Sequence, residues 1–221
     1  MTVKELLTYY PRAYHMAEYG TWDSIKRHGL LSTKALLDLF KVTGDRRLEL
    51  ESRHRPKCET IVHPENGSLA VIRDQKVLRE SSLRECLSGA TPREWYELLN
   101  SKTFFWVHQN RLIRLLKGKE YRDRRNCVIT VDTAKLLQSH TDRARLCPIN
   151  SGSTIYKPVK RSPATFHAIC DFPFHERRST RALENTVVEL AIDYSVPDIA
   201  DCTILVEHWQ ADKAIETVWK A

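Results

Sequence analysis

Short apolar runs separated by polar turns predict five or six strands along the 221-residue chain. A first strand is expected over residues 11–17, beginning at Pro11. The segment 59–72 holds two apolar runs around the turn signal Pro64–Gly67, and it fits either a hairpin or a loop. Later runs rich in β-branched and aromatic residues predict further strands, which cover 103–108, 126–132, 185–193 and 203–209.

Helices are predicted between these strands, and several of them have recognisable ends. The helix over 22–28 stops at Gly29, because glycine adopts a left-handed conformation at low cost. Ser32 is placed to cap the next helix, over 33–40. A long irregular stretch is expected over 141–165. The other helical patterns cover 81–87, 91–100, 110–118 and 133–140.

This order of elements favours the α+β class. Strands and helices do not alternate as regular units, and no glycine-rich dinucleotide or phosphate loop is present. No repeat or linker divides the chain, so we expect one domain over residues 1–221. No run approaches the roughly 18 apolar residues that span a bilayer, and the N-terminus lacks an apolar signal-peptide centre. We therefore expect a cytoplasmic protein without a membrane partner.

Composition adds two constraints. The net charge of +7 permits binding to polyanions. The basic runs are scattered and bordered by acidic residues, so each fits a solvated face or a nucleic-acid or nucleotide-phosphate contact. The six cysteines form no C-x-x-C pair, which excludes a zinc ribbon, and we expect reduced thiols and no metal site.

Three polar residues stand in strand-like surroundings. His15 lies inside the first strand, Glu189 lies within a run of valine, leucine and isoleucine, and Arg73 directly follows an apolar run. A carboxylate in such a strand is disfavoured both by strand propensity and by desolvation. Two explanations without function remain open: Glu189 faces solvent on a half-exposed strand, and His15 is a structural histidine.

The surroundings of these residues resemble a known family in three blocks. Tyr14 and His15 are followed by a helix that leads into Gly29 and Leu30, and the strand with Glu189 is followed by a Ser-Val-Pro turn. An aromatic strand followed by an arginine gives a weaker third match. In these features the chain resembles the DarT group of DNA ADP-ribosyltransferases, over residues 13–33, 103–114 and 186–206. It also resembles an uncharacterised bacterial family that shares the IRDQ, FFW, VDT and INSG blocks.

The DarT resemblance implies a split mixed sheet with inserted helices and NAD as co-substrate. It further implies ADP-ribosyl transfer, with a nucleobase in DNA or RNA as acceptor, a toxin- or defence-like role, and an antitoxin or regulatory protein as a possible partner. Catalysis would fall to Glu189 and Arg73, with Arg79 or Arg84 as alternatives to Arg73. The residues implied in NAD binding are His15, Tyr14, Gly29, Leu30, Phe105 and Arg111. His15 and Glu189 should then lie on adjacent strands and face one cleft, and side chains that point to opposite sides of the sheet would contradict the hypothesis.

Two other functions stay open. One is a non-catalytic module of the same fold that binds nucleic acid or a nucleotide. The other is an NAD-dependent RNA 2′-phosphotransferase, for which Arg27 and His28 supply part of the Arg-His-His-Arg pattern. The glycine- and hydroxyl-bearing segment Asn150, Ser151, Gly152, Ser153 lines a substrate site or forms a surface loop.

Overall fold

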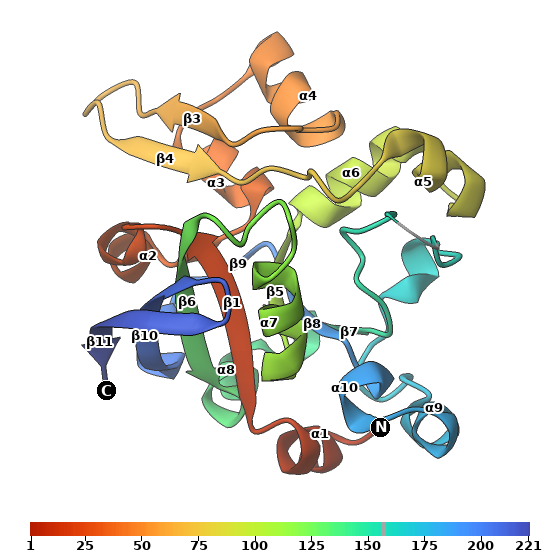
Figure 1. Ribbon diagram of the computed structural model, residues 1–221. Coiled ribbons are helices and arrows are strands. Elements are labelled where there is room, and N and C mark those ends of the chain that lie inside the picture. The colour runs from red at the N-terminus through yellow and green to blue at the C-terminus, as the bar shows by residue number, and fades with distance from the viewer. Residues whose placement is uncertain (156–157) are drawn as a thin grey trace.

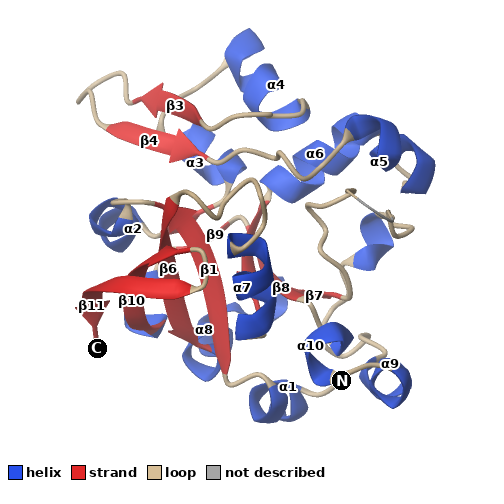
Figure 2. Ribbon diagram, in the orientation of Figure 1, coloured by secondary structure: helices blue, strands red, loops and turns tan. Residues whose placement is uncertain are grey.

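A seven-stranded antiparallel sheet with helices on both faces forms the centre of the molecule (Figure 1; Figure 2). The computed structural model describes residues 1–155 and 158–221. The strand order is β11-β10-β6-β1-β5-β8-β7, so the first strand of the sheet in sequence lies in its middle. The α+β class expected from the sequence is confirmed.

The elements have the following bounds. The sheet strands are β1 Arg12–Glu18, β5 Lys102–Trp106, β6 Arg125–Asp132, β7 Ala144–Cys147, β8 Glu189–Asp193, β10 Thr203–Gln210 and β11 Lys213–Lys220. Two small ladders pair β2 Leu30–Leu31 with β9 Ser195–Val196, and β3 Glu59–Val62 with β4 Leu69–Ile72. The α-helices are α1 Val3–Tyr9, α2 Trp22–His28, α3 Thr33–Leu39, α4 Gly44–Ser52, α5 Glu80–Cys86, α6 Pro92–Asn100, α7 Gln109–Leu116, α8 Thr133–His140, α9 Phe174–Thr180, α10 Leu183–Thr186 and α11 Ile199–Cys202.

Most of the predicted elements are present. Ser32 caps α3 by accepting the backbone N–H of Ala35 at 3.1 Å, and α2 ends at Gly29. The segment around Pro64–Gly67 is a hairpin, which decides between the two alternatives left by its sequence. The mixed sheet implied by the resemblance is not seen, since every neighbouring pair in the large sheet is antiparallel. A helix between two strands is long enough to allow either parallel or antiparallel pairing, and in this sheet every strand runs antiparallel to its neighbours.

Three sequence expectations need correction. The stretch 141–165 is not wholly irregular, because it contains β7, which pairs with β8; residues 156 and 157 of this stretch lie outside the described residues. The strand expected over 185–193 begins only at Glu189, and its first two residues belong to α10, which ends at Thr186. Strand β11 was not expected, because nearly all of its residues are exposed and it carries no apolar face to recognise.

The two faces of the sheet have separate cores. Helix α7 packs on one face, where Leu112 and Leu116 meet Val128 of β6. Helix α8 packs on the other face, where Leu136 joins a larger core that includes Ala13 of β1. A third core belongs to the hairpin lobe, which we define as α3, α4, β3 and β4 and which lies at the top of Figure 1, beyond one end of β1. Within the described residues, no helix combines the length and apolarity needed to cross a membrane.

The backbone pairing of the sheet is least extensive between β1 and β5. These strands share one paired position, Tyr14 with Trp106, whereas β1 and β6 are paired over the full length of β1. Beyond that position the two strands separate and leave an opening in the middle of the sheet.

Gly29 lies beside this opening, where the backbone passes very close to Pro197. Its φ of +84° lies in the region that favours glycine, and a Cβ at this position would lie 2.6 Å from Cα of Pro197. The close approach allows β2 to pair with β9, so the blocks 13–33 and 186–206 of the resemblance are in direct contact.

We expect Gly29→Ala to destabilise the protein more than Gly20→Ala. Both glycines have positive φ, but a Cβ at Gly20 has no atom within 4 Å. Gly20→Ala should cost about 1–2 kcal/mol from backbone strain alone, and Gly29→Ala about 1–3 kcal/mol more from the clash. Urea denaturation of the two variants measures the difference, and equal losses would contradict the close approach at Pro197.

Candidate functional site

A cavity of about 410 Å³ lies at the opening between β1 and β5, and we call it the first cavity. This volume is within the range of small-molecule sites. Its walls come from all three blocks of the resemblance and from the hairpin lobe. Residues that line it include His15, Glu18, Gly29, Leu30, Phe40, Leu69, Arg73, Lys102, Phe104, Trp106, Asn150, Ser151 and Glu189.

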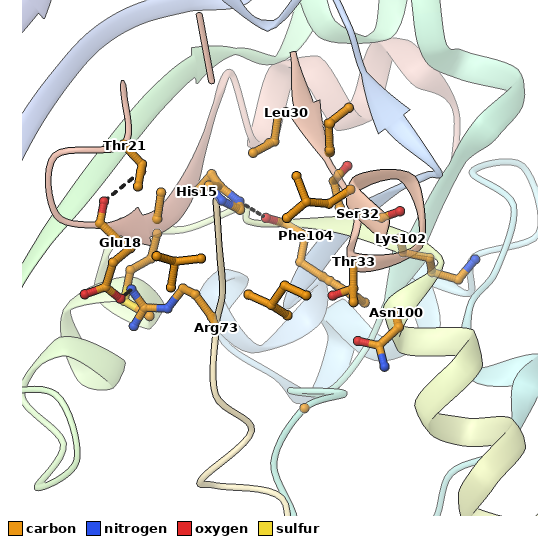
Figure 3. Close-up of a pocket in the computed structure, with 18 of the residues that line it drawn as sticks. His15, Glu18, Thr21, Leu30, Ser32, Thr33, Arg73, Asn100, Lys102 and Phe104 are labelled. Carbon is orange, nitrogen blue, oxygen red and sulfur yellow. Dashed lines mark hydrogen bonds and ion pairs between the residues drawn. The ribbon is translucent and has the colours of Figure 1, made fainter. Parts of the chain in front are cut away.

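His15 stands in the opening itself. Figure 3 shows its ring pointing at β5, where Nδ1 lies 2.8 Å from the carbonyl oxygen of Phe104. A carbonyl oxygen only accepts, so Nδ1 carries the proton and Nε2 keeps a free lone pair. The imidazole thus replaces a ladder hydrogen bond that β1 and β5 do not make.

The charge state of His15 follows from its surroundings. The ring is partly buried, and this burial lowers the pKa of His15 to about 4, an effect to which the nearby charge of Arg73 adds. The ring of Phe105 supports it from the core, with 5.8 Å between ring centroids. At neutral pH the histidine is uncharged and its Nε2 acts as a hydrogen-bond acceptor.

Glu189 is the first residue of β8 and is only 4 % exposed. The explanation that it faces solvent is therefore wrong. Its two carboxylate oxygens each lie 3.2 Å from the backbone nitrogen of Ser151, which donates to them. Burial raises the pKa of Glu189 to about 7, although the hydrogen bonds from Ser151 and the charge of Arg161 oppose the rise. A buried carboxyl that titrates near neutral pH and lines a cavity is suited to acid–base chemistry.

The arrangement expected for His15 and Glu189 is wrong, because their strands are not adjacent and the two side chains leave the sheet on opposite faces. Strand β5 lies between their strands, and the register aligns Tyr14, Trp106 and Glu189. Directly paired residues share a face, so His15 leaves β1 on the other side. Both side chains nevertheless line the same cavity, because it extends through the opening and touches both faces. The lining of the cavity therefore includes residues from both faces of the sheet.

The segment around Ser151 is held in place by Arg161. This arginine is 3 % exposed and donates to the carbonyl oxygens of Ser151 and Ser153, each at 2.9 Å. Asn150, Ser151 and Gly152 line the first cavity, so this segment is part of a site rather than a free surface loop. Sequence reasoning missed Arg161. It follows a lysine and precedes Ser-Pro, a context that is typical of a solvent-exposed side chain.

Of the three candidate arginines, Arg73 lines the first cavity, whereas Arg79 and Arg84 are exposed and do not. Arg73 donates to Glu18 at 3.3 Å and to the side-chain oxygen of Asn126 at 3.2 Å. Figure 3 shows it beside Glu18 at the edge of the cavity. Its charge is thus partly balanced by a neighbouring carboxylate.

Other residues implied by the resemblance lie elsewhere. Gly29 and Leu30 line the first cavity, but Tyr14 and Phe105 do not. Alternation along β5 turns Phe105 into the core, where it is 1 % exposed, and directs its two neighbours in the strand, Phe104 and Trp106, to the cavity. Tyr14 packs with the core under α7. Arg111 lines a different cavity, described below.

Comparison with protein families gives a match over residues 11–203 to a family described as a family of unknown function, DUF7002. The chain belongs to the DUF7002 family. No curated protein and no solved structure matches the chain significantly. The region shared with DUF7002 contains every residue of the first cavity, whereas α1 and β11 lie outside it.

The raised pKa of Glu189 predicts how stability depends on pH. The folded pKa of about 7 exceeds the usual value of 4.5, so the protonated form is favoured on folding. The stability associated with this group is fully present below about pH 4.5 and is lost as the pH rises through 7. Glu189→Gln, which stays neutral, should therefore gain on the order of 3 kcal/mol relative to the wild type between pH 4.5 and pH 8.

Urea denaturation of both proteins at several pH values measures this difference. Other groups that titrate, His15 among them, are present in both proteins and cancel in the comparison. A difference that does not change with pH would contradict a carboxyl buried with a pKa near 7.

Proposed function

We propose that this member of DUF7002 is an NAD-dependent ADP-ribosyltransferase that modifies a nucleobase in DNA or RNA. One observation carries the proposal. His15 and Glu189, which lie far apart in sequence, line the same cavity, one as a neutral hydrogen-bond acceptor and the other as a carboxyl with a pKa of about 7. The three blocks of the DarT resemblance support it further, since all of them contribute to that cavity.

The lining of the first cavity suits a dinucleotide. Apolar side chains such as Leu30, Phe40 and Leu69 form one part of it and offer a surface for a flat base. Nε2 of His15 is available to accept a hydrogen bond from a ribose hydroxyl, and Arg73 offers a positive charge at the edge for a phosphate.

Glu189 supplies the chemistry in this proposal. Breaking the bond between nicotinamide and ribose gives a transition state with oxocarbenium character, as in glycoside cleavage, and the bonding electrons leave with nicotinamide. A carboxylate beside the ribose stabilises the developing positive charge. The acceptor base then forms the new bond to the ribose carbon, and its proton passes to Glu189, whose pKa of about 7 allows it to take up a proton at neutral pH.

The proposal predicts turnover that depends on Glu189. The protein is incubated with radiolabelled NAD and with single-stranded DNA, RNA or protein, and nicotinamide release and label transfer are measured. Glu189→Gln should lower both rates at least about 100-fold, while Glu85→Gln, an exposed residue of α5 outside the cavity, should leave them unchanged.

Each other result points elsewhere. NAD binding without any release would favour the non-catalytic module. A cyclic phosphate product from 2′-phosphorylated RNA would favour the phosphotransferase. Release that is equal in wild type and Glu189→Gln rejects the role given to Glu189.

The pKa of Glu189 also predicts the pH profile of the rate. The carboxylate is the active form, so kcat/KM for NAD should rise with pH and level off above about pH 7. His15, with a pKa of about 4, stays neutral and adds no change between pH 5 and pH 8. Initial rates from pH 5 to pH 9 test this, and a rate that falls between pH 6 and pH 8 would assign the limiting group to another residue.

A further inference from the structure

A second cavity, of about 430 Å³, adjoins the first. It is formed by α7, by the segment that follows β7 and by the residues around α10. Three arginines line it: Arg111, Arg161 and Arg181. None of the described residues in its lining carries a carboxylate, and Asn150, Ser153 and Asn185 add neutral polar groups.

Among the described residues, none of these three guanidinium groups forms an ion pair, although the charges of Glu184 and Glu189 act on Arg111 from outside the lining. Arg161 donates to backbone carbonyls, and Arg111 donates to the carbonyl oxygen of Glu184 at 2.9 Å and to the side chain of Asn185. These partners are neutral, so they orient the guanidinium groups without cancelling their charge. Arg181 is exposed, and in the described part of the chain its guanidinium forms no ion pair. Burial lowers the pKa of Arg111, helped by the charges of Arg114 and Arg181 and opposed by those of Glu184 and Glu189.

The two cavities meet beside Glu189. Asn150 lines both of them. The carbonyl oxygen of Ser151 accepts from Arg161 in the second cavity, and the N–H of the same residue donates to Glu189 in the first. An anion in the second cavity would thus lie next to the carboxyl that is proposed to act on the acceptor.

We infer that the second cavity binds a phosphodiester of the nucleic-acid strand whose base enters the first cavity. Planar guanidinium groups are the side chains best suited to phosphate oxygens. A strand has a phosphate on each side of every base, so a phosphate site next to Glu189 fits a base that reaches this residue. The inference deepens the proposed function, on which it rests for the nature of the acceptor.

Arg181 gives the sharpest test, because its side chain is exposed and its replacement should not disturb the fold. Binding of labelled single-stranded DNA and RNA is measured by fluorescence anisotropy for wild type, Arg181→Gln and Arg53→Gln at several salt concentrations. Arg53 is an exposed arginine at the end of α4 and controls for the general loss of one charge. Arg181→Gln should weaken binding about five- to tenfold whatever the sequence, with a salt slope lower by about one, whereas Arg53→Gln should bind like the wild type.

NAD affinity, measured by calorimetry on the same proteins, separates the two sources of phosphate. It should be unchanged in Arg181→Gln. Weaker NAD binding with unchanged oligonucleotide binding would assign the second cavity to the dinucleotide and overturn the inference. Equal losses in the two arginine variants, or no oligonucleotide binding by the wild type, would overturn it as well.

The test also distinguishes this inference from the proposed function. Glu189→Gln should bind oligonucleotides as the wild type does, because the phosphate site needs no turnover. If nicotinamide is never released but binding still depends on Arg181, the enzymatic proposal fails and the nucleic-acid site stands.

Discussion

The hydrogen bond from His15 to the carbonyl oxygen of Phe104 is the interaction on which the site depends. Strands β1 and β5 are neighbours in the sheet, yet they are paired at one position, and an unpaired backbone carbonyl at this depth would be costly. The imidazole satisfies that carbonyl and at the same time keeps the strands apart. A leucine here would fill the space without satisfying the carbonyl. The same hydrogen bond fixes the tautomer of His15. A single interaction therefore accounts for both the opening between the strands and the free Nε2.

Glu189 illustrates the complementary constraint of desolvation. The carboxyl is buried at the start of a strand, and its partners are a single backbone N–H, the neighbouring thiol of Cys147 and the distant charge of Arg161. Because these partners do not outweigh the burial, the group titrates near neutral pH. A direct ion pair would have kept the pKa low and the carboxylate permanently charged. The structure instead places Arg161 behind the Ser151 segment, where it bonds to backbone carbonyl oxygens.

Local signals in the sequence were sufficient for much of the fold but not for the site. Helix ends at Ser32 and Gly29 could be predicted because caps depend on adjacent residues. Strand β7 could not, because four residues with a charge in the middle become a strand only beside β8. Likewise, the resemblance implied Phe105, although the register of β5 directs Phe104 and Trp106 to the cavity. The face that a residue takes is set by partners distant in sequence, and no local pattern contains it.

The central position of β1 in the sheet has a consequence for synthesis of the chain. This strand leaves the ribosome early, but β5 and β6, which flank it, follow much later, and Glu189 comes near the end. Contacts between residues so distant in sequence form slowly, because a long loop must close first. The cavity that His15 lines therefore cannot form until most of the chain has been synthesised. A nascent or truncated chain that stops before β8 lacks Glu189, so the first cavity is complete only once nearly the whole chain has been made.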